Sequence, residues 1–286
     1  MHKILDAEYL TIYFVLITFA EITVAYVSPQ AGIFFHIIIL CLLFIHSGFI
    51  NKEKMSINKL QWFMIKEKKK PSSLVQKLID KRVKLTSILL ALTLVPLIRI
   101  LSLVMPLSHF PRIQWFIIIG IAVYLAFLVL VYQQKINIRD CGLQLPTKKH
   151  VPIEVGIILL GIPLGFAEYF ILRPTPFIDS FSIENIIVSV LILFIATGLM
   201  EEVIFRGLLQ KKSTDILGVW PGILFITLIF AVLHIGNLSL LDVLLVFSIG
   251  GLYAVVVKTT KTVLGVSISH TVVNVFLFII CPLILI

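Results

Sequence analysis

Long, uninterrupted apolar runs constrain this chain more than any other feature. A membrane crossing needs about 20 apolar residues, and in lipid only helices or closed barrels satisfy every backbone hydrogen bond. The runs are continuously apolar instead of alternating, so they predict helices and an all-α, polytopic transmembrane helical bundle. We expect eight or nine spans, near residues 9–26, 31–50, 85–107, 113–133, 152–171, 184–205, 219–235, 240–257 and 262–283.

The composition agrees with a membrane protein and excludes other classes. Apolar residues make up 59% of the 286 residues and charged residues 14%, and the mean hydropathy is +1.08. These values lie far from those of an ordinary globular domain. The three cysteines are scattered and form no CxxC pair, so neither a disulfide framework nor a thiolate metal site is indicated. We expect a multi-pass protein of the cell membrane.

The basic residues gather in the connections between spans. Eleven Lys and Arg residues fall between Lys52 and Lys84, and we expect a surface loop here with a short interfacial helix near 74–84. The positive-inside rule places this loop in the cytoplasm. Because the loop has no recognisable nucleic-acid module and no interleaved aromatic residues, contact with anionic lipid of the bilayer is expected and a nucleic-acid partner is not.

The polar motifs lie late in the chain and divide it into two parts. Residues 1–150 are predicted to form N-terminal transmembrane helices with the basic cytoplasmic loop. Residues 151–286 are predicted to form the core that carries chemistry. In the N-terminal part, Glu21 and Arg99 lie in the outer halves of their spans, as does Glu168 of the later part, so an ion pair among these three is expected.

One motif lies near the end of the apolar run 185–200. Glu201 and Glu202 are adjacent, and Arg206 follows the second carboxylate by four residues. On a helix Glu202 and Arg206 share a face, whereas Glu201 is rotated by about 100° from Glu202. We therefore expect Arg206 to hold Glu202 ionised and Glu201 to face a cavity. By itself, an acid–base pair at this spacing is also an ordinary helix-stabilising device.

Two further polar pairs follow, each spaced i, i+4. They are Phe230 with His234, and His270 with Asn274. A single intramembrane histidine is often a packing or hydrogen-bonding residue. An asparagine in a membrane helix is costly without a partner, so the second pair is expected to face the bundle interior. Phe230 is predicted to form a wall of the substrate site.

Together these groups fit hydrolysis of a peptide or amide bond by activated water. A carboxylate can take the proton of the water, an imidazole can orient that water, and an Asn/His pair can stabilise the oxyanion. Glu201, His234 and His270 also match the ligand inventory of a catalytic zinc site. The helical HExxH motif is absent, so zinc stays open as a cofactor. No Gly-x-Ser-x-Gly elbow is present, which argues against a serine-type protease.

The three motifs, in this order on three late spans, resemble those of the CPBP family, which contains CAAX proteases and bacteriocin-processing enzymes and is related to Ras-converting-type CAAX prenyl endopeptidases. The resemblance covers roughly residues 184–282 and implies an intramembrane endopeptidase of glutamate or metallo type. The resemblance implies that Glu201 is the water-activating base and that His234 is its imidazole partner. It implies that His270 and Asn274 stabilise the oxyanion. Glu202 and Arg206 are the supporting residues.

The resemblance leaves the substrate open and raises one geometrical difficulty. The expected partner is a peptide or protein substrate. A prenylated substrate and a substrate embedded in the membrane are the alternatives. By the predicted boundaries, Glu201 and His270 lie toward the cytoplasm, whereas His234 lies nearer the outer end of its span. The rival functions are a non-catalytic immunity or scaffold protein and, less favoured, an ion-coupled transporter, which should show paired broken helices that the sequence does not reveal.

Overall fold

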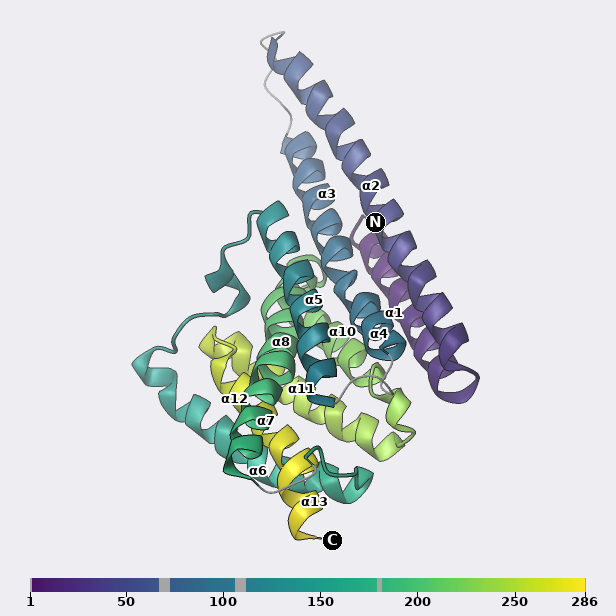
Figure 1. Cartoon of the computed structure of the whole chain (residues 1–286). Helices are drawn as coiled ribbons and strands as arrows, with labels where there is room; N and C mark the ends of the chain where they lie inside the picture. The colour runs from purple at the N-terminus through teal and green to yellow at the C-terminus, as the bar shows by residue number, and fades with distance from the viewer. Residues whose placement is uncertain (1, 67–72, 106–111, 179–181, 286) are drawn as a thin grey trace.

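The fold is a bundle of helices in a computed structural model that describes residues 2–66, 73–105, 112–178 and 182–285 (Figure 1). Within these ranges the regular elements are all helical. Nine stretches there are long and apolar enough to cross a membrane: Ala7–Tyr26, Pro29–Ile57, Val75–Val104, Ile113–Gln133, Lys148–Leu172, Ile183–Leu217, Val219–Asn237, Leu240–Thr260 and Leu264–Ile284. The prediction of an all-α polytopic bundle is confirmed, with the higher of the two expected counts.

Several stretches comprise more than one helical element. The principal helices of the first part are α1 (His2–Tyr26), α2 (Pro29–Lys66), α3 (Ser73–Leu92), α4 (Leu94–Val104) and α5 (Arg112–Gln133). Those of the second part are α6 (Val151–Leu172), α7 (Ile183–Leu193), α8 (Met200–Glu202), α9 (Gln210–Leu217), α10 (Val219–Val232), α11 (Leu240–Thr260), α12 (Leu264–Val275) and α13 (Cys281–Ile284). In Figure 1, α6 and α11 run obliquely to α5, so the bundle is not a set of parallel rods.

The basic segment differs from the expected loop. Helix α2 continues through it to Lys66, and α3 already begins at Ser73, so both helices run beyond the apolar zone (Figure 1). Residues 67–72 of the expected loop lie outside the described residues. Lys, Gln and Leu are good helix formers, and an ion pair of 3.1 Å between Arg82 Nη2 and Glu53 Oε2 joins the two helices. The apolar run therefore marks the membrane crossing but not the end of the helix.

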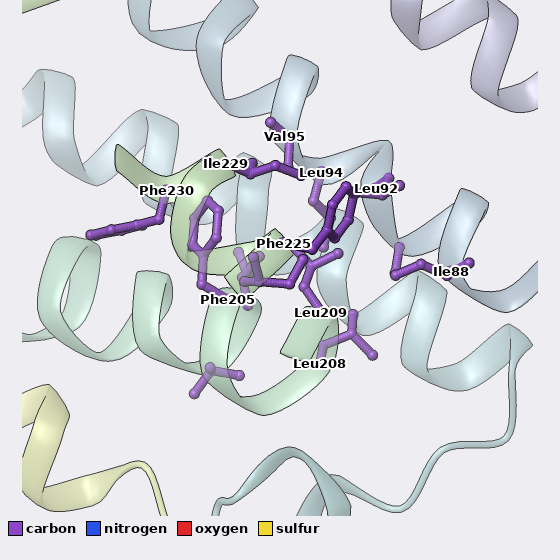
Figure 2. Close-up of a cluster of buried hydrophobic side chains, with 14 of the residues drawn as sticks. Ile88, Leu92, Leu94, Val95, Phe205, Leu208, Leu209, Phe225, Ile229 and Phe230 are labelled. Atoms are coloured by element: carbon purple, nitrogen blue, oxygen red, sulfur yellow. The ribbon is translucent and has the colours of Figure 1, made fainter. Parts of the chain in front are cut away.

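The main hydrophobic core joins the two parts of the chain. Figure 2 shows Ile88, Leu92, Leu94 and Val95 of α3 and α4 meeting Phe205, Leu208, Leu209, Phe225, Ile229 and Phe230. The turn between α3 and α4 at Thr93 has a physical cause, because Pro96 has no N–H to donate to the preceding turn. The N-terminal helices thus support the segment that carries Glu201 and Glu202.

Helix α12 packs against α6 over small residues. A methyl group at Gly161 would lie 2.7 Å from the Ser269 carbonyl oxygen, and one at Gly165 would lie 2.6 Å from Phe276 Cβ. Their spacing of four residues is the small-xxx-small pattern that lets membrane helices approach closely. Glu154 adds a polar contact, because its Oε2 accepts a hydrogen bond of 2.7 Å from the Gly265 backbone N–H at the start of α12. These contacts determine the position of His270 and Asn274.

Candidate active site

The Glu201 segment is a long helix with two wide turns. Between α7 and α8 lies the π-helical η3 (Phe194–Leu199), and between α8 and α9 lies the π-helical η4 (Val203–Leu209). π-helical turns in α-helices are frequent at functional sites, since each shifts the register of the side chains that follow. The two glutamates occupy the short α-helical turn between them. Local backbone geometry thus marks this point before any side-chain contact is considered.

Glu202 joins two of the predicted motifs. Its Oε1 accepts hydrogen bonds from Arg206 Nη1 at 3.0 Å and from His270 Nδ1 at 2.9 Å. Both Glu202 and Arg206 are buried, with 0% and 3% of their surface exposed. The Arg206 guanidinium also lies over the Phe230 ring, 4.0 Å from its centroid. The Glu202–Arg206 contact is the one the spacing predicts, whereas the link to His270 is not visible in the sequence.

Glu201 occupies a different environment from its neighbour. It lines a cavity of about 490 Å³ whose wall also contains Phe230, His234, His270 and Asn274. Its Oε2 lies 3.9 Å from His270 Nε2, and 26% of its side chain is exposed. Of the seven residues named by the motifs, five therefore surround one cavity, while Glu202 and Arg206 lie behind them. The geometry leaves the Glu201 carboxylate accessible to a water molecule.

His234 lies just past the last turn of α10. Its Nδ1 is 2.9 Å from the Phe230 carbonyl oxygen, which can only accept, so Nδ1 carries the proton. In a neutral ring Nε2 is then left with its lone pair. The difficulty over depth is resolved because α10 has only 14 residues, about 21 Å, and is followed by the short 3₁₀ turn η5 (Ile235–Asn237). A short helix brings His234 into the wall that contains Glu201.

Asn274 is held by a residue that the sequence interpretation missed. Asn274 Nδ2 donates to Thr197 Oγ1 at 2.9 Å, and Thr197 Oγ1 in turn donates to the Leu193 carbonyl oxygen at 2.5 Å. A methyl group at Gly198 would lie 2.2 Å from Thr271 Oγ1, so η3 and α12 are in close contact here. Thr197 precedes Glu201 by four residues, and this i, i+4 spacing is the signal that could have found it.

Other polar residues that the motifs did not include line the same cavity. Arg99 lies in the wall and is paired with Glu21, by contacts of 2.6 Å from Nε and 2.7 Å from Nη2. The predicted ion pair therefore forms between these two residues. Glu168 does not join it: this carboxylate lines the cavity, is 7% exposed and makes no hydrogen bond with the described residues. The N-terminal part of the chain thus supplies part of the cavity wall.

The zinc hypothesis can be tested against the side chains that could bind the metal. The residues that the structure describes contain no group of three His, Cys, Asp or Glu side chains that could hold a metal ion. His270 and His234 have their Nδ1 atoms on Glu202 and on a backbone carbonyl, which leaves Nε2 of each ring free, so the objection is the spacing of the three groups and not the orientation of the rings. Glu201, His234 and His270 in this arrangement do not fit a zinc site. We therefore assign no step of the chemistry to a metal.

The structure thus places a polar cavity inside a bundle of apolar helices, and a known family matches the part of the chain that carries its motifs. Residues 183–276 match the family described as "Type II CAAX prenyl endopeptidase Rce1-like". This match confirms the resemblance predicted from the three motifs: residues 183–276 of the chain are similar to that family.

A relative from Escherichia coli, described as an "Uncharacterized 24.3 kDa protein", is 30% identical over 140 residues. The similarity covers 46% of this chain and 63% of that protein, so the chain spans less than two thirds of the relative's length. No solved structure is significantly similar to the chain.

Proposed function

We propose that this protein is an intramembrane endopeptidase in which Glu201 activates the attacking water. The observation that carries the proposal is the different surroundings of the two adjacent carboxylates. Glu202 is engaged by Arg206 and His270, whereas Glu201 lines the cavity and leaves its oxygens accessible. A general base must lie within hydrogen-bond reach of the proton that it takes, and Glu201 is the carboxylate so placed.

His234 is the proposed partner of Glu201 in holding the water. With its proton on Nδ1, its Nε2 can accept a hydrogen bond from a water in the cavity. The water then attacks the carbonyl carbon of the scissile peptide bond and transfers a proton to the Glu201 carboxylate. The oxygen–carbon bond that forms converts the carbonyl oxygen to an oxyanion.

His270 and Asn274 are the proposed donors to that oxyanion. Asn274 Nδ2 carries two N–H groups, of which one is directed to Thr197, so the second is available to the substrate. Glu202 holds the His270 ring through Nδ1 and leaves Nε2 on the side of Glu201, where the doubly protonated ring can donate. When the oxyanion collapses, the carbon–nitrogen bond breaks and the leaving amine takes the proton from Glu201.

The size and the apolar lining of the cavity suit a peptide substrate. A volume of about 490 Å³ is within the range of ligand pockets and accommodates a short peptide segment. Aromatic residues provide much of the apolar wall: Trp115, Phe116, Phe205, Phe230 and Phe278. We propose that Phe230 contacts the substrate, and that the substrate is a protein embedded in the membrane or attached to it by a lipid group.

The test compares membranes that contain wild-type protein with membranes that contain Glu201→Gln. The variant removes a base and little volume, so we expect a loss of about 10²–10⁴-fold in cleavage and the accumulation of an uncleaved substrate detectable by proteomics. Glu184→Gln, at an exposed glutamate in the first turn of α7, is the matched control. Cleavage by Glu201→Gln at the control rate would contradict the proposal and favour a non-catalytic role.

A further inference from the structure

A second cavity, of about 420 Å³, is lined by basic residues at span ends and connections, which the positive-inside rule places in the cytoplasm together with the 52–84 segment. It is lined by the connection between α5 and α6, by η4 and α9, by the start of α10 and by the end of α11. Four cations outside the predicted motifs face it, namely Arg139, Lys211, Lys258 and Lys261, together with one carboxylate, Asp140. We call it the basic cavity. No step of the proposed hydrolysis uses it.

Backbone contacts hold the walls of the basic cavity in place. The Gly142 carbonyl oxygen accepts a hydrogen bond of 3.0 Å from the Val263 N–H, and Gln144 Nε2 donates to the Lys261 carbonyl oxygen at 2.8 Å. The other side of the same connection packs on η4, because a methyl group at Gly207 would lie only 2.2 Å from the Cys141 carbonyl oxygen. The α5–α6 connection is therefore fixed to both neighbours and gives the cavity a defined shape.

The charges in the basic cavity do not cancel. Lys211 Nζ is paired with Asp140 Oδ2 at 3.3 Å, and this uses the one carboxylate in the wall. Within the described part of the chain, Arg139, Lys258 and Lys261 form no ion pair with a carboxylate. Three cations around one cavity favour an anion with several oxygen acceptors, and basic pockets between membrane helices on the cytoplasmic side suit phosphate-bearing headgroups.

One rim of the basic cavity carries exposed apolar side chains. Lys258 Nζ lies 3.9 Å from the centroid of the Trp220 ring, and Trp220 is 61% exposed. Its neighbour Val219, in the cavity wall, is 45% exposed. Tryptophan is enriched at the level of lipid headgroups, and lysine near it directs its ammonium group to the same level. A lipid can therefore place its headgroup in the cavity with its chains alongside α10.

We propose that the basic cavity binds the phosphate group of an anionic phospholipid. Free inorganic phosphate offers the same chemistry. The exposed Trp220 and Val219 on the rim favour the lipid. Arg206 also lines this cavity and lies over Phe230, which belongs to the wall of the candidate active site. The proposed lipid site is thus separated from that site by one side-chain layer, but its existence does not rest on the proposed hydrolysis.

The experiment measures binding with purified protein in detergent micelles. Dioctanoyl-phosphatidylglycerol, dioctanoyl-phosphatidylcholine and inorganic phosphate are titrated separately, and binding is followed by the shift in melting temperature and by native mass spectrometry. The neutralised variant carries Arg139→Gln, Lys258→Gln and Lys261→Gln. A matched control removes three exposed charges on the same side of the bundle, by Lys135→Gln, Lys148→Gln and Lys149→Gln.

We expect phosphatidylglycerol to bind wild-type protein and the control equally, and the neutralised variant on the order of 100-fold more weakly. A third variant, Arg139→Lys with Lys258→Arg and Lys261→Arg, should keep wild-type binding, which separates loss of charge from loss of folding. Binding of inorganic phosphate as strong as that of the lipid would assign the site to the free ion. Equal binding of the lipid to wild-type protein and the neutralised variant, or equal binding of phosphatidylcholine, would overturn the proposal.

Discussion

Two largely buried clusters of the same three residue types lie at the candidate cavity. The N-terminal cluster consists of Glu21, Arg99 and His36, and the motif cluster consists of Glu202, Arg206 and His270. In each, one glutamate contacts both an arginine and a histidine: Glu21 Oε1 lies 2.6 Å from Arg99 Nε and 3.1 Å from His36 Nε2. Glu202 Oε1 lies 3.0 Å from Arg206 Nη1 and 2.9 Å from His270 Nδ1.

The clusters differ in what surrounds them. Beside the motif cluster stands a second carboxylate, Glu201, which faces the cavity, and the histidine of that cluster lies in the cavity wall. In the N-terminal cluster the histidine is fully buried and does not line the cavity. Both clusters contain an acid, a base and an imidazole, so these three groups alone do not distinguish the proposed catalytic site. What distinguishes the motif cluster is the additional, accessible carboxylate of Glu201 in the cavity wall.

The largest expected effect comes from truncating either arginine. Arg99→Ala and Arg206→Ala each leave a buried carboxylate without its cation, and we expect each to lower the free energy of unfolding by about 3–5 kcal/mol. Glu21→Gln with Arg99→Gln should recover most of that stability and keep cleavage, whereas Glu202→Gln with Arg206→Gln should recover stability without cleavage. Thermal unfolding in detergent, with a double-mutant cycle for each pair, measures this. Equal loss of cleavage in both double variants would erase the distinction between the clusters.

The next largest expected effect concerns Asn274, which lines the same cavity wall as His270 of the motif cluster. Asn274→Ala removes the proposed oxyanion donor, and we expect cleavage to fall by about 10²–10³-fold. Thr197→Val leaves Asn274 in place but removes its partner, so a smaller loss of about tenfold is expected, corresponding to one hydrogen bond. Initial cleavage rates at saturating substrate check both values. A larger loss in Thr197→Val than in Asn274→Ala would contradict the assigned roles.

A smaller effect is expected from methyl groups at close helix contacts. Gly161→Ala places Cβ 2.7 Å from the Ser269 carbonyl oxygen, and Gly32→Ala places it 2.8 Å from the Val24 backbone nitrogen. Each should cost about 1–3 kcal/mol of stability. Gly161→Ala should also lower cleavage, because it displaces α12, whereas Gly32→Ala, near the N-terminal cluster, should not. Gly156→Ala, on α6 with no atom within 4 Å, is the control and should raise stability slightly.

The smallest expected effect is that of Glu168→Gln. This carboxylate lines the cavity without a hydrogen-bond partner among the described residues, so its replacement breaks no pair. We expect the stability to stay unchanged or to rise by up to about 1 kcal/mol, because a buried ionisable group is removed. The melting temperature reports this directly. A loss comparable to that of Arg206→Ala would show that Glu168 belongs to a third buried pair.

The sequence by itself determined the helical spans and the three motifs. Long apolar runs can satisfy their backbone groups in lipid only as helices, so eight or nine spans follow from local composition, and the described residues contain nine candidates. Periodicity then identifies which residues share a helix face, as for Glu202 and Arg206. Because apolar length marks only the crossing, the extension of α2 to Lys66 did not follow from the same argument.

Tertiary structure decided which faces meet. Helical spacing says that His270 and Asn274 point the same way, but not that His270 contacts Glu202 and Asn274 contacts Thr197. Those contacts depend on how closely η3 and α6 approach α12, and on the shift in register that the π-helical turns introduce. The placement of Arg99 in the cavity wall depends on packing between helices far apart in the chain, and no local pattern contains that information.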